Sequence, residues 1–302
     1  MDVPVLFLTF NRPHHSRRVL ESIRKARPSK LYFHNDGPRT GRSDEAKACA
    51  EVRNLSKEID WPCEVFTWFR DDNVGCKLGV SSAITWFFER EEMGIILEDD
   101  CLPEPSFFTY CSELLHKYRD KEDIFMISGN HFLPDKYLKE KDDYYFTQYA
   151  FIWGWASWRW AWDKYSLSNE DTNKPKFAVP IGQIVSNAFS IYYLADKFRN
   201  AFSNKIDSWD FQWFYTLLLH KGKCINPSVH LVTNIGIGME STHTDSVNKY
   251  LHIKAGSLPA DLNYSGTEES IPLQQSQVIF DRVYKSKWKG FLWYLKQRLF
   301  GR

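Results

Sequence analysis

Three consecutive acidic residues, Glu98, Asp99 and Asp100, directly follow the apolar run 94–97. A short apolar run of this kind predicts a buried strand, and open α/β sheets bind their ligands at the carboxyl ends of strands. Charges of like sign this close raise one another's pKa, so the cluster requires a cation or hydrogen-bond donors. Mg²⁺ and Mn²⁺ suit carboxylate oxygens and are usually held by one or two carboxylates together with substrate phosphates. The triplet therefore predicts a metal-bridged diphosphate site.

Two other predicted strands end in polar side chains that would face the triplet. The apolar runs 3–10 and 31–34 end at Asn11-Arg12 and, two residues on, at Asp36. Loops at one edge of a parallel sheet converge on one crevice, where Arg12 can neutralise phosphate or hold a base and Asp36 can accept hydrogen bonds from a base or ribose. The alternatives are that Arg12 is a surface residue at a helix start and that Asp36 forms an Asx turn.

Composition and missing motifs exclude several classes of function. No GxGxxG follows the first predicted strand and no GxxxxGK[ST] occurs anywhere, which argues against NAD binding and against a P-loop NTPase. The net charge of +1 gives no overall basic field for nucleic acid. Aromatic residues make up 16% of the chain, including 12 tryptophans, and this content suits both a core and a sugar-binding cleft.

The order of the predicted elements defines the fold class. Strands alternate with helices up to the triplet, which is typical of βαβ units and a parallel sheet with right-handed crossovers. The predicted strands are 3–10, 31–34, 64–69, 94–97, 124–128 and 144–149, with short ones near Cys224 and Val229. The predicted helices are 13–26, 43–59, 79–92, 106–117, 155–165, 180–202 and 208–220.

The strand-end residues carry a family resemblance. Asn11-Arg12, Asn35-Asp36-Gly37, Asn73-Val74-Gly75 and the E-D-D motif Glu98-Asp99-Asp100 resemble the GT-A glycosyltransferases. The N-acetylglucosaminyltransferase I type branch is more similar, because there a P-x-F-F-x-Y segment follows the E-D-D motif, as residues 105–110 do here. Later matching landmarks are Ser128-Gly129-Asn130, Gly154-Trp155, Trp209-Asp210, and Gly236-Ile237-Gly238 with His243.

The resemblance implies a fold and an activity. The fold would be a Rossmann-like, mostly parallel sheet flanked by helices. Residues 1–130 would form its nucleotide-sugar-binding half, 131–275 a mixed acceptor-binding half of the same domain, and 276–302 a basic C-terminal helix. The activity would be metal-dependent transfer of a sugar such as N-acetylglucosamine from a UDP-sugar to a glycan acceptor, with inversion, in cell-surface polysaccharide synthesis.

The resemblance also implies roles for the strand-end residues. Asp100 would coordinate Mn²⁺ or Mg²⁺, which bridges the donor diphosphate. Asp99 would hydrogen-bond the donor sugar, and Glu98 would support the ribose or metal-bound waters. Arg12 and Asp36 would bind the uridine.

The remaining implied roles belong to loops and to a predicted helix start. Asn73 and Gly75 would belong to the nucleotide-binding loop, and His243 would lie near the diphosphate in a loop spanning 236–248. Asp210 would be the general base. Its aromatic surroundings at 208–214 independently favour a raised pKa. The alternative is a helix N-terminal aspartate stabilised by the helix dipole.

A tryptophan-rich stretch at 153–162 permits two interpretations. As a helix, it would place Trp155, Trp158 and Trp162 on one face, which is the pattern of a core stripe. Trp153 precedes Gly154, where the chain has little bulk, and could approach a ligand. It is the candidate sugar platform of this stretch.

The ends of the chain and its cysteines bear on location. The six cysteines form no CxxC pair and are expected to be reduced thiols of a cytosolic protein. The start shows no signal peptide, and no apolar run is long enough to span a membrane. Residues 282–302 read as a basic amphipathic helix, which predicts contact with the inner membrane surface and a lipid-linked glycan acceptor. The alternative is a helix docked on the domain.

Two other functions remain open. A sugar-phosphate nucleotidyltransferase also uses acidic strand ends with Mg²⁺, but it usually carries a glycine-rich basic loop after its first strand, and none is present here. A carbohydrate-binding protein without turnover would not need both the acidic triplet and Asp210. Both alternatives are therefore less favoured than a glycosyltransferase.

Overall fold

The first four strands form the parallel half of a sheet. The computed structural model describes residues 1–236 and 253–284, with β1 (Val5–Thr9) between β2 (Lys30–Asn35) and β4 (Met93–Glu98) and with β3 (Glu64–Phe69) outside β2. All three neighbouring pairs are parallel. Their carboxyl ends therefore share one edge of the sheet, as predicted for the strands that end in polar residues.

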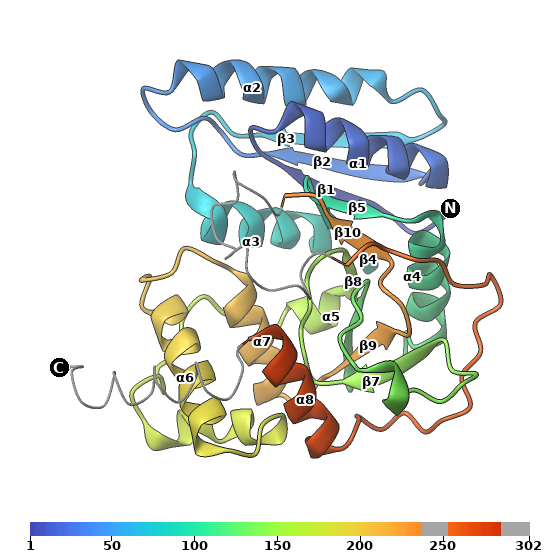
Figure 1. The fold of residues 1–302 in the computed structure, drawn as a ribbon. Helices are drawn as coiled ribbons and strands as arrows, with labels where there is room; N and C mark the ends of the chain where they lie inside the picture. The colour runs from blue at the N-terminus through green and yellow to red at the C-terminus, as the bar shows by residue number, and fades with distance from the viewer. Residues whose placement is uncertain (237–252, 285–302) are drawn as a thin grey trace.

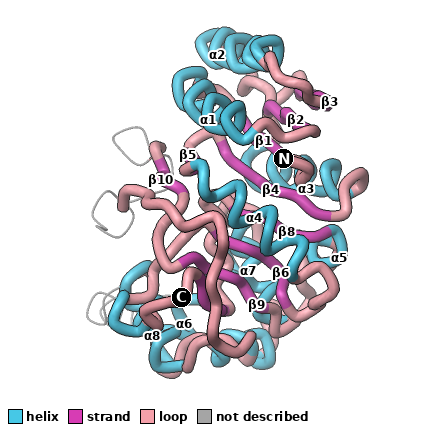
Figure 2. Tube along the Cα trace, turned by 90° about the vertical axis from the view of Figure 1, so that its right-hand side faces the viewer, coloured by secondary structure: helices cyan, strands magenta, loops and turns pink. Residues whose placement is uncertain are grey.

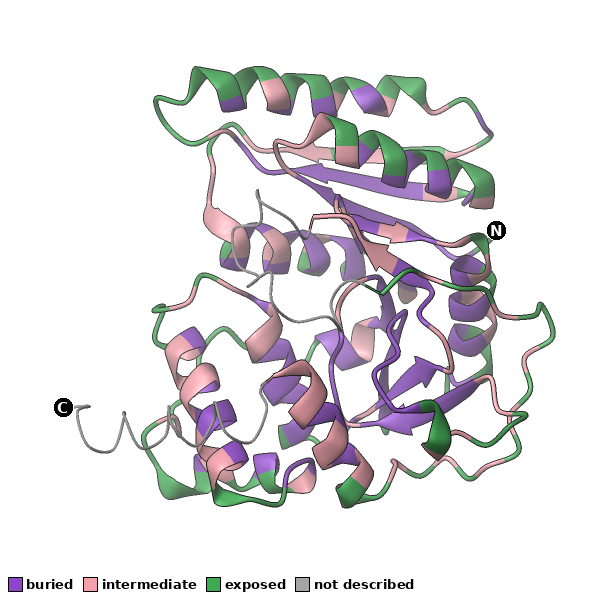
Figure 3. Cartoon of the chain, viewed as in Figure 1, coloured by how far each residue is buried: buried purple, intermediate pink, exposed green. Residues whose placement is uncertain are grey.

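Helices cover both faces of this half, because its buried strands are apolar on both sides. Val5 and Phe7 belong to the core beneath α1 (Pro13–Ala26), α2 (Ser43–Asn54) and α4 (Pro105–Lys117). Leu6 and Leu8 point to the opposite face and pack in the core with α3 (Gly75–Phe88). The alternation along β1 thus divides the core into two clusters, and Figure 3 shows the outer surfaces of α1 and α2 exposed.

The second half extends the same sheet in the order β4-β8-β6-β9-β7. Strand β8 is antiparallel to β4 and β6, β9 is parallel to β6, and β7 is antiparallel to β9. Figure 2 shows the strands in succession from β3 to β9. The bounds are β6 (Ile124–Ser128), β7 (Tyr144–Thr147), β8 (Trp155–Trp158) and β9 (Lys223–Pro227). The predicted α/β class with a mostly parallel sheet flanked by helices is confirmed.

A small two-stranded sheet and further helices complete the described fold (Figure 1). Strand β5 (Cys101–Pro103) pairs antiparallel with β10 (Val232–Asn234) next to the acidic triplet. The helices α5 (Arg159–Trp162), α6 (Ala188–Phe202), α7 (Asp210–Leu219) and α8 (Leu273–Val283) pack in the same core as α3. Short 3₁₀ segments lie at Leu55–Glu58, Asp135–Tyr137, Pro175–Ala178 and Pro180–Gln183.

The predicted helix at 155–165 is wrong. Residues Trp155–Trp158 form β8, and only Arg159–Trp162 is helical. Trp155 and Trp158 therefore lie in the two different core clusters on opposite faces of the sheet. Periodicity alone does not show whether a short apolar run forms a strand or a helix. Here the run forms a strand because it pairs with β4 and with β6. The expected core role holds, because Trp155, Trp158 and Trp162 are 0%, 2% and 3% exposed.

Other predictions along the chain need smaller changes. The predicted strands 64–69 and 124–128 and the helix 13–26 coincide with β3, β6 and α1. Helix α3 starts at Gly75 rather than at residue 79, and no strand forms at Val229. The predicted helix 208–220 corresponds to α7, which begins at Asp210 with Trp209 as its N-cap residue. All six cysteines are free, and four of them are buried.

None of the described helices, taken singly, combines the length and the hydropathy that a membrane span requires. The bent pair Pro175–Gln183 and Ala188–Phe202 meets the length and composition requirement only when its two parts are taken together. Most of the predicted basic helix lies outside the described residues, which end at 284.

Buried histidines predict a loss of stability in acid. His230 is 5% exposed, and burial, reinforced by the nearby His131, lowers its pKa from 6.5 to about 4. Between these pH values the unfolded chain binds a proton at His230 and the folded chain does not. The free energy of unfolding therefore falls as the pH drops from 6.5 to 4, by up to about 3 kcal/mol from this residue.

The variant His230→Asn tests this effect, because asparagine keeps an acceptor for the His131 backbone N–H, which now donates to His230 Nδ1 at 3.3 Å. Urea unfolding of both proteins from pH 7 to pH 4 should show their stability difference shrinking as the pH falls. A difference that stays constant over this range would rule out His230 as a source of acid lability.

Candidate active site

A cavity of about 660 Å³ opens at the carboxyl ends of β1, β2 and β4. It brings together residues from strand ends, from the start of α3 and from the loop before α7. Its polar lining consists of Thr9, Asn11, Arg12, His34, Asp36, Arg39, Asn73, Cys76, Glu98, Asp99, Asp100, Asp207 and Asn234. The rest of its lining is Leu8, Phe10, Gly75, Gly79, Val80, Ile152, Trp153 and Gly236.

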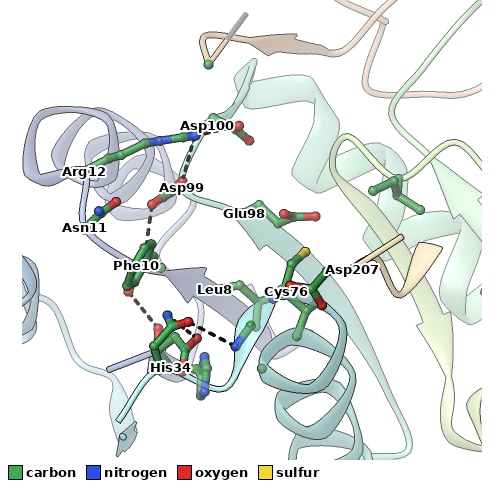
Figure 4. A pocket seen from close by; sticks show the side chains of 18 of the residues that line it. Leu8, Phe10, Asn11, Arg12, His34, Cys76, Glu98, Asp99, Asp100 and Asp207 are labelled. Carbon is green, nitrogen blue, oxygen red and sulfur yellow. Dashed lines mark hydrogen bonds and ion pairs between the residues drawn. The ribbon is translucent and has the colours of Figure 1, made fainter. Parts of the chain in front are cut away.

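The acidic triplet lies at one end of this cavity (Figure 4). Asp99 is 8% exposed, and its Oδ2 accepts a hydrogen bond from the Phe10 backbone N–H at 3.2 Å. Arg12 Nη1 lies 3.0 Å from Asp100 Oδ2 and 3.7 Å from Asp99 Oδ1. Figure 4 shows the Glu98 carboxylate pointing toward the side of the pocket that holds Cys76 and Asp207.

The triplet carries more negative charge than its protein partners balance. Burial, followed by repulsion from Asp100, raises the pKa of Asp99 to about 7. Burial, followed by repulsion from Asp100, Asp99 and Asp210, also raises the pKa of Glu98 well above its usual range. Within the described chain, Arg12 is the only basic side chain that forms an ion pair with the triplet. A bound cation would therefore favour the ionised carboxylates.

The donor atoms present suit a hard divalent cation, with one restriction. In the described part of the chain, no group of three or more His, Cys, Asp or Glu side chains is arranged to hold a metal ion. A magnesium or manganese ion commonly takes only one or two carboxylates from the protein and completes its shell with water and substrate phosphates. The triplet fits this second type of site and does not fit an all-protein cage.

The segment after β10 is fixed directly against Asp100. The Ile235 N–H donates to the Asp100 backbone oxygen at 2.8 Å. A Cβ atom on Gly236 would lie 2.4 Å from Asp100 Oδ2, so a larger residue at this position would displace the Asp100 side chain. The predicted nucleotide-covering loop therefore begins at the triplet. The rest of it, including His243, lies outside the described residues.

The predicted uridine residues lie in the same cavity but have protein partners. Asp36 Oδ1 accepts from the Gly37 N–H at 3.0 Å, and its Oδ2 accepts from Asn73 Nδ2 at 2.9 Å. The Val74 N–H lies 3.4 Å from both oxygens. Asn73 Oδ1 in turn accepts from the Gly75 N–H at 3.2 Å. The alternative of an Asx turn does not hold, because the residue two positions on is Pro38, which has no N–H. Apart from the contact with Gly37, these hydrogen bonds join the end of β2 to the start of α3.

Asp207 is a pocket residue that the sequence analysis missed. Its two carboxylate oxygens accept hydrogen bonds from the backbone N–H groups of Cys76 and Lys77, at 3.0 Å and 2.9 Å. These N–H groups belong to the first turn of α3, where the helix dipole favours a negative charge. No sequence pattern links residue 207 to residue 76. In contrast, His34 could have been found from strand alternation, because it shares a face of β2 with Asp36.

Asp210 lies beside the cavity rather than in its lining. It is half-buried in the first turn of α7, and its carboxylate accepts a hydrogen bond from the Ser208 hydroxyl group. Burial is the main cause of the raised pKa values of Glu98 and Cys76, two residues that line the cavity, and the charge of Asp210 adds to both. The structure therefore brings Asp210 near the triplet, although more than a hundred residues separate them in the sequence.

These features define an α/β protein with an acidic pocket at the carboxyl edge of its sheet. No family model and no curated protein matches the sequence. Among solved structures, TarS 1-349 of S. aureus is 9% identical with a TM-score of 0.41. The match covers 76% of this chain and 58% of the TarS chain. Mouse xyloside xylosyltransferase 1 is 14% identical with a TM-score of 0.36. The match covers 72% of this chain and 81% of the xylosyltransferase chain.

Two further structures are similarly distant. A UDP-glucose pyrophosphorylase complexed with UDP-glucose is 10% identical with a TM-score of 0.38, and the match covers 75% of this chain and 90% of that one. The chain spans 56% of HddC from Yersinia pseudotuberculosis and 58% of TarS 1-349. TM-scores this low do not establish a common function.

Proposed function

We propose that the protein is a metal-dependent glycosyltransferase that moves a sugar, such as N-acetylglucosamine, from a UDP-sugar to a glycan or lipid-linked glycan. The observation that supports this most is the acidic triplet, which lines a 660 Å³ cavity with Arg12 as its basic partner. A cavity of this size suits a small-molecule ligand. Its excess of carboxylates suits a ligand that arrives with a divalent cation.

Each acidic residue then has a role in donor binding. Asp100 would hold Mn²⁺ or Mg²⁺, with Asp99 and Glu98 facing the donor sugar, the ribose or metal-bound water. The bound cation would neutralise the charge that develops on the leaving diphosphate. Arg12 touches the triplet rather than Asp36, so we assign it to the phosphates in preference to the uracil.

The nucleoside would occupy the other part of the cavity, around the end of β2. Both carboxylate oxygens of Asp36 accept hydrogen bonds from the protein, and the contacts of Asn73 with Asp36 and with the Gly75 N–H hold this end of β2 against the start of α3. The proposed contacts to the base or ribose come from this end of β2. The role of His243 at the diphosphate remains a proposal for a residue outside the described chain.

Asp210 is the proposed general base of an inverting displacement. The acceptor oxygen would form a bond to the anomeric carbon, the bond from that carbon to the diphosphate oxygen would break, and the acceptor proton would pass to Asp210. Asp207 is a weaker candidate, because the backbone N–H groups of Cys76 and Lys77 already occupy both of its carboxylate oxygens. Asp210 accepts its bond from a serine hydroxyl group instead.

The alternative functions gain less support from the same region. After β1 the chain passes through Phe10, Asn11 and Arg12 directly into α1, leaving no room for a glycine-rich phosphate loop of a nucleotidyltransferase. A carbohydrate-binding protein without turnover has no evident need for Asp210 beside a cluster of acids. The proposed setting, cell-surface polysaccharide synthesis at the inner membrane face, is an extension of the glycosyltransferase proposal.

A panel of nucleotide sugars tests the proposal. A ligand that binds only the folded protein raises the unfolding midpoint by mass action. We expect UDP-sugars to raise it by several degrees with Mn²⁺ and by little in EDTA, while Mn²⁺ alone has a small effect. UDP released slowly from the bound donor would then separate an enzyme from a binding protein. If no nucleoside diphosphate shifts the midpoint in any metal, the proposed function is wrong.

A further inference from the structure

We propose that Trp153 is the surface on which a pyranose ring packs in this cavity. The inference deepens the proposed function, since it assigns a residue that positions a sugar. Trp153 lines the cavity together with Ile152, and it lies just before β8, the strand that pairs with β4. Its neighbours Trp155 and Trp158 are buried core residues, whereas Trp153 is half-buried. Trp160 is half-buried as well, but Trp153 is the tryptophan of this stretch that lines the cavity.

The backbone of Trp153 is held in place from several sides. Its N–H donates to Asn130 Oδ1 at 3.2 Å, and Asn130 is completely buried. The next residue, Gly154, has φ +66, and its carbonyl group accepts from the Gly129 N–H at 2.8 Å. A Cβ on Gly154 would lie 2.7 Å from Val232 Cγ2. This turn therefore requires glycine, and the hydrogen bonds hold the backbone on both sides of the Trp153 Cα atom.

The indole ring itself is supported by another aromatic ring. Phe132 meets it at a centroid distance of 6.3 Å and an angle of 70°, an edge-to-face arrangement. Phe132 is 3% exposed and belongs to the core. A rigid ring that needs no ordering on binding loses little conformational entropy when a ligand packs on it. Trp153 is thus pre-organised as a flat apolar surface.

The polar groups near this surface suit the rim of a sugar. Within the described residues the Trp153 indole N–H has no protein acceptor, whereas the indole groups of Trp158 and Trp162 donate to Leu115 O and Thr85 Oγ1. The carboxylates of Glu98 and Asp99 line the same cavity and can accept hydrogen bonds from hydroxyl groups. An apolar ring and carboxylate acceptors that line one cavity are the combination of groups that recognises a pyranose.

The sugar can come from the donor or from the acceptor, and the binding experiment separates these sources. The variants are Trp153→Ala, Trp153→Phe, which keeps a ring but not the N–H, and Trp86→Ala as a control. Trp86 is half-buried on α3 and does not line the cavity. Calorimetry with Mn²⁺ would compare UDP with UDP-N-acetylglucosamine, and kinetics would give the KM for a glycan acceptor.

We expect Trp153→Ala to bind UDP within twofold of the wild-type protein. If the platform holds the donor sugar, its affinity for the UDP-sugar falls at least about tenfold, which equals ~1.4 kcal/mol. If it holds the acceptor, the acceptor KM rises by a similar factor with donor affinity unchanged. The affected quantity, UDP-sugar affinity or acceptor KM, should have a value in Trp153→Phe between those of Trp153→Ala and the wild type. Trp86→Ala should match the wild type in both assays.

The outcome that overturns the platform is a Trp153→Ala protein whose UDP-sugar affinity and acceptor KM both stay within twofold of wild type. Saturation-transfer NMR with free N-acetylglucosamine and an oligosaccharide keeps the proposal testable without a nucleotide. Sugar contacts that disappear in Trp153→Ala, in a protein that binds no nucleoside diphosphate, would support the platform and reject the donor proposal. A wild-type protein that binds UDP but no sugar in any form would reject the platform alone.

Discussion

Replacing Asp210 by asparagine is expected to lower the rate of sugar transfer by about 10²- to 10⁴-fold, the usual contribution of a general base. Asparagine keeps the size of the side chain and an acceptor for the Ser208 hydroxyl group, so α7 should keep its start. Donor affinity with Mn²⁺ should stay near the wild-type value, because Asp210 lies outside the lining of the cavity. Initial rates of UDP release with acceptor, together with calorimetric donor binding, measure both quantities.

Asp207→Asn is the matched control for this prediction. Asp207 lies three residues earlier, in the loop before α7, and its carboxylate binds the first turn of α3. Its replacement removes a charge from the helix N-terminus but leaves one acceptor, so we expect a loss of less than about tenfold in rate. An Asp210→Asn enzyme with near-normal turnover would overturn the base assignment. A large loss in Asp207→Asn alone would transfer that role to Asp207.

Asp100→Asn is expected to remove the metal dependence of donor binding. The substitution takes away the carboxylate that the proposal assigns to the cation, while the backbone hydrogen bond from the Ile235 N–H to the Asp100 oxygen remains possible. With Mn²⁺, affinity for UDP should fall at least about a hundredfold, or ~2.7 kcal/mol. In EDTA, the variant and the wild-type protein should bind UDP equally weakly.

The variant Arg12→Gln distinguishes an effect on the metal site from a general loss of stability. Arg12 now pairs with Asp100, so its removal takes away a cation that competes with the metal for the same carboxylate. We expect this variant to bind Mn²⁺ more tightly without nucleotide, and to bind UDP more weakly, because a positive charge near the phosphates is lost. Opposite changes in metal affinity for Asp100→Asn and Arg12→Gln are hard to explain by general destabilisation.

The parallel half of the fold could be predicted because its signals are local. The apolar run before Glu98 ends in a triplet, and β1, β2 and β4 each end in polar residues where the chain turns. Parallel pairing alone then gathers these ends at one edge. The order of the strands therefore predicted which residues meet in one cavity, namely Arg12, Asp36, Asn73 and the triplet.

The second half could not be predicted in the same way, because distant contacts decide it. The run Trp155–Trp158 becomes a strand only because β4 and β6 accept it between them. The position of Asp207 depends on how the loop before α7 meets the start of α3. Such contacts leave no pattern in the neighbouring sequence. The partners of individual side chains were equally inaccessible, as the pairing of Arg12 with Asp100 shows.

The most direct test of the central claim is the ³¹P NMR signal of UDP in the presence of trace Mn²⁺ and the protein. Paramagnetic Mn²⁺ broadens the signals of phosphorus atoms that it approaches. If the carboxylates hold a cation that bridges the diphosphate, both phosphorus signals of UDP are broadened much more by Mn²⁺ with the wild-type protein than by Mn²⁺ alone. Asp100→Asn causes no such additional broadening. Equal UDP affinity in Mn²⁺ and EDTA, with no extra broadening by the wild-type protein, would contradict the account.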